Sequence, residues 1–315
     1  MKINIEDIFN VLKDDMSGSQ KKLDVQTSLG VYYGITKDGY LRISFLSSTP
    51  APKLESTKLI LVTQGKESST VYWTCFDLIE PDIKQIFFLF CSDLIESILD
   101  IDNEKQALQK LRKRYIVWKT MFKNEVNTKI PREVLQGLYG ELYFLKNYII
   151  KKYSLDIAVN AWAGPDRKNK DFSMNEEWYE VKTIGANVDK VKISSLAQLD
   201  STYDGRLIVI RVESMSNQFD NGESSIADLL KQILSIIDDE TIESIFLSKV
   251  QAIGAVTSDE FITEKFDVKS VSAFLVKDGF PRLLPEDVNK TGVCDVVYSL
   301  FVEALKPYEE EIRWN

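Results

Sequence analysis

The sequence reads Lys170-Asp171-Phe172-Ser173-Met174-Asn175-Glu176-Glu177-Trp178-Tyr179-Glu180-Val181-Lys182-Thr183 at the point that decides the fold. This pattern predicts a strand, a tight polar turn and a second strand. Residues two apart on a strand share a face, so Glu180 and Lys182 point the same way and Val181 points the other way. A hairpin partner can bring Asp171 beside them. Two carboxylates and one ammonium at a strand end favour a hard divalent metal ion.

The 315-residue chain contains no histidine. This excludes Ser-His-Asp and Cys-His nucleophilic catalysis, zinc hydrolases built on imidazole and histidine-dependent metal nucleases. The three cysteines, Cys75, Cys91 and Cys294, are scattered, so neither a disulfide framework nor a zinc site is predicted. Any hydrolytic chemistry must therefore use carboxylates, lysine, tyrosine or a metal-bound water.

The charge of the chain is unevenly distributed. A net charge of −9 argues against indiscriminate binding of polyanions. Residues 105–124 nevertheless carry basic side chains and no acidic ones. Such a basic island fits directed phosphate contact and fits a solvated helix face about equally well. Its candidate substrate contacts are Lys110, Arg112, Lys113 and Arg114.

The apolar segments suggest a cytoplasmic protein without a membrane segment. The amino terminus has no long apolar run after Lys2, so we expect no signal peptide. No apolar stretch is long enough to span a bilayer. The longest, residues 85–91, is interpreted as a buried strand.

Four regions are predicted along the chain. Residues 1–95 form a β-rich amino-terminal domain with a hairpin turn at Asp38-Gly39, and residues 96–130 form a helical connector with the basic island. Residues 131–215 form an α/β core that begins with a helix from Pro131 to about Lys152. Residues 216–315 complete this core or mediate assembly.

A carboxylate two residues before a lysine is not rare in this chain. It recurs at Asp82-Ile83-Lys84, Asp166-Arg167-Lys168 and Asp267-Val268-Lys269. The third is the serious alternative, because an acidic residue precedes it and an apolar run follows. Only Glu180-Val181-Lys182 combines a strand, an upstream strand aspartate, a glutamate on a preceding helix (Glu141) and a following helix.

Five short segments together resemble the PD-(D/E)XK nuclease superfamily. They are Gly140-Glu141-Leu142, Asp171-Phe172, Glu180-Val181-Lys182-Thr183, Ser194-Ser195 and Gln198-Leu199. More narrowly, they resemble an uncharacterised bacterial family of PD-(D/E)XK motif proteins, often associated with restriction-modification loci. The close match covers about residues 131–215. The resemblance implies a restriction-endonuclease-like α/β core (α+β overall), with a mixed central sheet flanked by helices.

The resemblance also implies roles for individual residues. Asp171 and Glu180 would hold Mg²⁺, or Mn²⁺ in its place, with the Val181 carbonyl as a further ligand and Glu141 acting through water. Lys182 would position or deprotonate the attacking water, and Gln198 would orient substrate or water. Pro165-Asp166 carries the literal Pro-Asp, but Asp171 has the strand placement and is favoured. The alternatives are an ion-paired surface for Glu180 and Lys182, a turn residue for Asp171 and a surface helix residue for Glu141.

The function that the resemblance implies is a Mg²⁺-dependent endodeoxyribonuclease, the cleavage component of a restriction or antiphage system. Its partners would be DNA and either a second copy or a methyltransferase or ATPase subunit. Two alternatives stay open: an inactive nuclease fold that binds DNA or acts as a scaffold, and a nuclease acting on RNA or repair intermediates. The acidic charge keeps both open, since it predicts weak unaided DNA binding.

Overall fold

The computed structural model describes residues 5–12, 17–122, 131–164, 170–174, 176–203, 205–252, 263–288, 291–293 and 295–311. These residues form two compact units, one from the residues up to 122 and the other from residue 131 onward. Within the described ranges, no helix is both long and apolar enough to cross a membrane.

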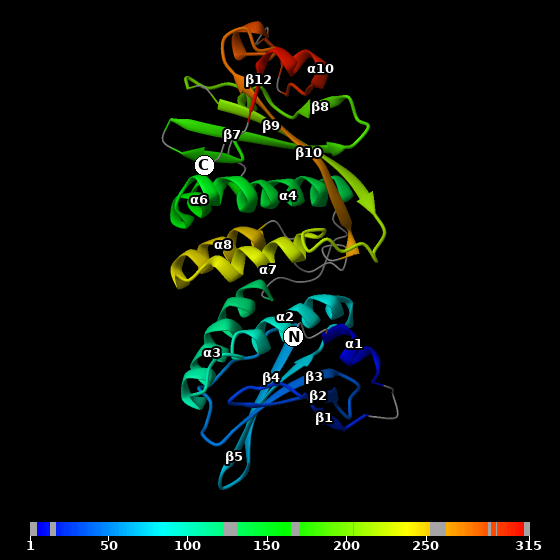
Figure 1. The fold of residues 1–315 in the computed structure, drawn as a ribbon, viewed down its shortest axis with the longest axis vertical. Helices are drawn as coiled ribbons and strands as arrows, with labels where there is room; N and C mark the ends of the chain where they lie inside the picture. The colour runs from blue at the N-terminus through cyan, green and yellow to red at the C-terminus, as the bar shows by residue number, and fades with distance from the viewer. Residues whose placement is uncertain are drawn as a thin grey trace. The chain divides into compact units, whose positions relative to one another are not determined.

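The first unit is built on a five-stranded antiparallel sheet in the order β1-β2-β3-β5-β4 (Figure 1). Its strands are β1 (Gln20–Lys22), β2 (Gly30–Ile35), β3 (Leu41–Ser47), β4 (Ile60–Ser68) and β5 (Val71–Leu78). The turn between β2 and β3 has Gly39 at φ 86°, a conformation that glycine adopts without a steric penalty. The predicted hairpin at Asp38-Gly39 is confirmed.

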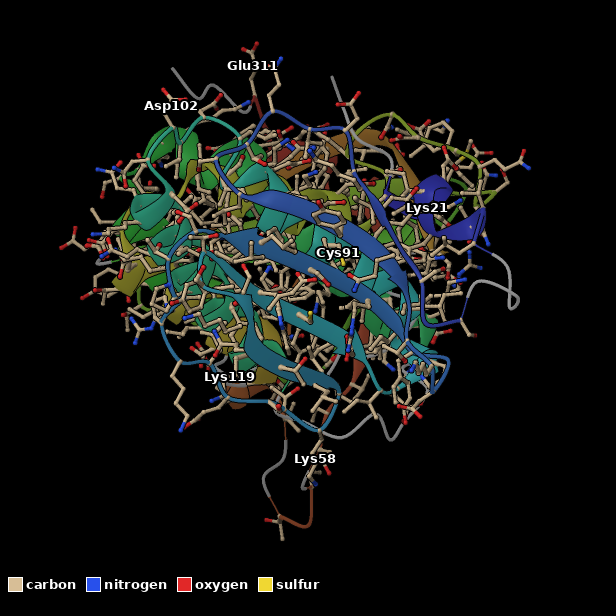
Figure 2. The ribbon with its side chains drawn as sticks, turned by 90° about the horizontal axis from the view of Figure 1, so that it is seen from below. Lys21, Lys58, Cys91, Asp102, Lys119 and Glu311 are labelled. Carbon is tan, nitrogen blue, oxygen red and sulfur yellow. The ribbon has the colours of Figure 1, made fainter. Side chains whose placement is uncertain are left out.

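Helices cover one face of this sheet, and Figure 2 views the unit with the strands in front and Cys91 of α2 behind them. They are α1 (Ile5–Asn10), α2 (Lys84–Glu96), which follows a 3₁₀ turn at Pro81–Ile83, and α3 (Glu104–Met121). The Phe76 ring of β5 lies 5.4 Å from the Phe90 ring and 5.0 Å from the Tyr115 ring. The core of the unit therefore lies between the sheet and α2 and α3.

The prediction of a buried strand over residues 85–91 is wrong, because this run forms the first part of α2. Ile86, Phe87, Phe90 and Cys91 are all buried, at spacings that fit a helix buried on most sides. A short run that is apolar throughout has no period of two or of 3.6, so periodicity alone does not separate a strand from a buried helix.

The second unit contains a mixed sheet in the order β12-β10-β9-β7-β6. Its strands are β6 (Phe172–Met174), β7 (Glu177–Gly185), β9 (Gly205–Met215), β10 (Lys265–Val276) and β12 (Glu309–Glu310). β7 runs parallel to β9, and the other neighbours are antiparallel. A separate antiparallel pair joins β8 (Lys190–Ile193) to β11 (Tyr298–Phe301). The mixed central sheet expected for a restriction-endonuclease-like fold is confirmed.

Helices and the two-stranded ribbon lie on opposite faces of this sheet (Figure 1). The helices on the face opposite the ribbon are α4 (Arg132–Phe144), which continues through a π-helical turn at Leu145–Ile149 into α5 (Ile150–Lys152), then α6 (Leu155–Ala161), α7 (Ile226–Ile236) and α8 (Glu240–Ala252). The short helix α10 (Val302–Leu305) follows β11 and lies on the ribbon side (Figure 1), where Leu305 packs with Val191 of β8. The Phe144 ring of α4 lies 5.5 Å from the Tyr179 ring. Trp178 and Ile184 pack into the cluster that includes Val191 of β8. Odd-numbered residues of β7 thus face α4, and even-numbered ones face the ribbon.

Candidate active site

Asp171 is fixed at the edge of β7, immediately before β6. The hairpin pairs Phe172 with Tyr179, which places Asp171 opposite Glu180. The Val181 N–H donates to Asp171 Oδ2 over 2.7 Å, and the Ala163 N–H donates to the Asp171 carbonyl over 2.7 Å. The N–H and C=O of a strand residue point to the same side, so the Val181 carbonyl faces the edge on which Asp171 lies. The predicted strand–turn–strand arrangement is confirmed.

Glu180 and Lys182 form an ion pair on the face of β7 that looks away from α4. Lys182 Nζ lies 2.8 Å from Glu180 Oε1, and the Glu180 side chain is only 2% exposed. Its second oxygen, Oε2, is buried and has no hydrogen-bond partner among the described residues. Lys182 Nζ also donates to Gln198 Oε1 over 3.3 Å. A buried carboxylate oxygen without a donor is costly, and a bound cation would satisfy it.

Glu141 reaches the site because α4 crosses β7 at a glycine. A Cβ at Gly140 would lie 1.8 Å from Thr183 Oγ1, so only glycine permits this close approach. Glu141 Oε2 then accepts a hydrogen bond of 2.7 Å from Trp162 Nε1. Trp162 is fully buried and forms a β-bridge with Phe172, so it connects Glu141 to the strand that follows Asp171.

The three carboxylates influence one another's protonation. Burial, and then the charge of Asp171, raises the pKa of Glu180 to about 8, while Lys182 lowers it. Burial also raises the pKa of Asp171, opposed by Lys182 and by the Val181 N–H. The Glu141 side chain keeps some exposed area but its carboxylate is surrounded by protein, and this desolvation, followed by the charge of Asp171, raises its pKa well above the usual range. Carboxylates whose pKa is raised by burial, and for Glu180 and Glu141 also by the charge of Asp171, favour a site completed by a cation.

The donor set fits a hard divalent cation. The described residues contain no group of three or more Asp, Glu, Cys or His side chains placed to hold a metal ion. Mg²⁺, however, is commonly bound by one or two carboxylates together with waters. The unpaired Oε2 of Glu180, the neighbouring Asp171 and the Val181 carbonyl supply oxygen donors of this kind.

The comparison with protein families gives a match to the family described as "Putative PD-(D/E)XK family member, (DUF4420)", over residues 5–303. The chain belongs to this family. The comparisons with curated proteins and with solved structures find no match. Membership of the PD-(D/E)XK family indicates a nuclease-type enzyme, and such nucleases generally use divalent metals.

Two other acidic-x-Lys matches lie within the described residues, and neither forms a comparable PD-(D/E)XK site. Asp267 lies on β10, where Lys269 Nζ contacts its Oδ2 at 2.7 Å and Glu213 Oε2 at 2.9 Å in an exposed ion-pair group. Asp82 belongs to the 3₁₀ turn before α2 rather than to a strand. Pro165 and Asp166 lie outside the described residues. Among the described residues, Asp171 lies beside Glu180.

The candidate substrate contacts divide between the two units. Gln198 lies in a 3₁₀ turn (Leu196–Gln198) beside Lys182, where its Oε1 also accepts the Ser194 N–H over 2.7 Å. Lys110, Arg112, Lys113 and Arg114 lie on α3 of the first unit. Arg114 is buried and donates from Nε and Nη2 to Asp93, at 2.8 and 2.6 Å, so its guanidinium faces the interior.

Two residues at this site are not identified by the sequence pattern. Trp162 is fully buried, and no local pattern in the sequence indicates its hydrogen bond to Glu141. Lys170 marks only the start of the first strand in the sequence, yet it is buried beside Asp171. Both act through contacts with residues more than twenty positions away, which spacing along one element does not reveal.

Proposed function

We propose that this member of the PD-(D/E)XK family is a Mg²⁺-dependent endonuclease that hydrolyses DNA phosphodiester bonds, as the cleavage component of a restriction or antiphage system. The observation that supports it best is the buried Glu180 carboxylate, with one oxygen paired to Lys182 and the other without a donor in the described part of the chain, beside Asp171. Family membership supports the nuclease class.

In this proposal Asp171, Glu180 and the Val181 carbonyl hold the ion. When bound, Mg²⁺ would polarise the scissile phosphate and lower the pKa of a coordinated water. The Lys182 ammonium, held between Glu180 and Gln198, lies where it can orient the attacking water and offset phosphate charge. The Glu141 carboxylate, fixed by Trp162, would accept a hydrogen bond from a water of the site.

DNA contact is assigned to the exposed basic side chains of α3. Lys110, Arg112 and Lys113 are exposed on this helix, whereas Arg114 is left out because it is buried against Asp93. With a net charge of −9, such a protein gains little general attraction to DNA. We therefore assign it a second copy, or a methyltransferase or ATPase subunit, as the partner for double-strand cleavage.

Plasmid cleavage in Mg²⁺ tests the proposal. We expect the wild type to nick or linearise supercoiled DNA. Asp171→Ala and Lys182→Ala should lose about 10²- to 10⁴-fold in rate, the range attributed to a positioned acid–base group. Asp267→Ala is the matched control, since it removes an aspartate with the same spacing from lysine at an exposed ion-pair group. Equal cutting by all variants, or loss in Asp267→Ala alone, would remove the assigned site.

Two further arms of the same experiment separate the substrate and partner alternatives. Single-stranded RNA and branched DNA are offered in place of plasmid, and preferential cutting of either would replace the assigned substrate. Tight DNA binding without cleavage, in Mg²⁺ and in Mn²⁺, would instead favour a scaffolding subunit.

A further inference from the structure

Lys170 is a buried lysine whose ammonium group is fully used. Its Nζ donates to three backbone carbonyls, those of Ala197, Gln198 and Asp200, at 2.7, 2.6 and 2.9 Å. An ammonium has three N–H donors, so these three bonds saturate it. Ala197 and Gln198 end the 3₁₀ turn, where helical carbonyls lack partners and a cation is favourable, and Asp200 follows two residues after it.

The ring of Trp178 closes the pocket around this ammonium. Lys170 Nζ lies 4.0 Å from the centroid of the Trp178 ring, within the range of a cation–π contact. Gly205 of β9 also lies against the indole, where a Cβ would come within 1.9 Å of it. Trp178 Nε1 donates to the Tyr203 carbonyl over 2.9 Å. The indole is held in place by this hydrogen bond, and moving the ring would break it.

Lys170 connects two parts of the proposed active site. Its neighbour Asp171 is anchored to Val181 of β7. The turn that it holds presents Gln198, whose Oε1 accepts hydrogen bonds from Lys182 Nζ and from the Ser194 N–H. A continuous set of contacts thus runs from the Lys170 ammonium through the backbone of the turn to the Lys182 ammonium.

We infer that Lys170 is a positioning residue, which holds the Gln198 turn against the strand hairpin so that Gln198 keeps Lys182 in its working orientation. The catalytic part of this inference rests on the proposed function, but the structural part does not. Lys170 itself has no donor left for substrate, because all three of its N–H groups are engaged. Its effect must therefore pass through Gln198.

The test is a double-mutant cycle of Lys170→Met and Gln198→Ala, measured as kcat and KM for plasmid cleavage. We expect each single variant to lower kcat by about 10- to 100-fold and to leave KM little changed. This is the usual cost of losing a residue that orients a group of a metal site. If Lys170 acts through Gln198, the double variant is no slower than Gln198→Ala. A double variant slower by the product of the two single effects would overturn the inference.

A readout that needs no activity accompanies the cycle. Lysines are reductively methylated with ¹³C-formaldehyde, and the Lys182 signal is assigned by its absence in Lys182→Arg. We expect this signal to shift in both Lys170→Met and Gln198→Ala. Lys265→Met is the control. Lys265 is also a largely buried lysine of the same unit, but it lies on β10, where its Nζ is 3.4 Å from Asp228 Oδ2 of α7. A Lys182 signal that stays unchanged in Lys170→Met would overturn the inference.

The two proposals fail in different ways. If the wild type cuts nothing while the Lys182 signal shifts as expected, the proposed function fails and the positioning of Lys182 stands. If Lys170→Met does not fold, Lys170→Arg takes its place in the cycle, since arginine keeps the charge and several donors. Lys170→Arg should lower kcat in the wild-type background but not in the Gln198→Ala background. A double variant slower than Gln198→Ala by the full effect of Lys170→Arg would count against the inference.

Discussion

The crossing of α4 over β7 at Gly140 offers a direct test of how Glu141 is placed. In Gly140→Ala the new methyl would lie 1.8 Å from Thr183 Oγ1 and 3.0 Å from Thr183 Cβ. Rotation of the Thr183 side chain can move Oγ1 but not Cβ, and non-bonded carbons pack at about 3.5–4.0 Å. The helix and strand must therefore separate by about 0.5–1 Å.

This displacement should affect activity more than stability. Overpacking costs about 1–3 kcal/mol, and the better helix propensity of alanine offsets about 1 kcal/mol of it. We therefore expect unfolding free energy, measured in urea, to fall by about 0–2 kcal/mol. A shift of about 1 Å in a catalytic group can cost about 10²-fold, so plasmid cleavage should fall about 10- to 100-fold.

The same helix supplies the control. At Gly137, one turn earlier, an added Cβ meets nothing within 4 Å. Gly137→Ala should thus stabilise the protein by about 0.5–1 kcal/mol and leave cleavage unchanged. Adding Thr183→Gly to Gly140→Ala removes both the Oγ1 and the Cβ contact and should restore much of the activity, because Thr183 Oγ1 has no partner among the described residues to lose. Wild-type cleavage in Gly140→Ala, or no recovery in the double variant, would refute the reasoning.

Three further predictions concern charge and hydrogen bonding. The pKa of Glu180 is raised from 4.5 to about 8, so the metal-free folded protein holds a proton there that the unfolded chain has released. Thermal stability without metal should fall as pH rises between these values, and Glu180→Gln should remove that part of the dependence while weakening Ca²⁺ binding. Trp162→Phe removes a hydrogen bond to Glu141 worth about 1.5–3 kcal/mol if the carboxylate is charged, and should slow cleavage about tenfold with a native circular dichroism spectrum. Replacing Lys110 and Arg112 by glutamine should reduce the slope of log affinity for DNA against log salt by about one for each phosphate that the protein no longer neutralises.

The parts of the site that follow one strand could be predicted from the sequence. Alternation along residues 177–185 gives the shared face of Glu180 and Lys182, and the polar turn before it gives the pairing that brings in Asp171. The helix after Pro131 is predictable for the same reason, since its start signal and its apolar pattern are both local. These features depend on neighbours a few residues apart.

The remaining features depend on contacts that no local pattern encodes. Glycine at position 140 is unremarkable in a helical sequence until Thr183 is known to lie against it. The Lys170 ammonium meets carbonyls that lie 27 to 30 residues further along the chain. The pattern over residues 85–91 predicts the wrong element because burial on most sides removes the polar positions that distinguish helix from strand.

A comparison within one sheet indicates what makes the acidic-x-Lys spacing a metal site. Glu180-Val181-Lys182 and Asp267-Val268-Lys269 both lie on strands, and in both the lysine Nζ lies within 2.8 Å of the acid. The Asp267 side chain is 27% exposed, so water can solvate the carboxylate oxygen that Lys269 does not contact. The Glu180 side chain is 2% exposed, and within the described residues its Oε2 meets no donor. Spacing alone therefore yields an ion pair, whereas burial beside a second carboxylate leaves an oxygen that a cation can bind.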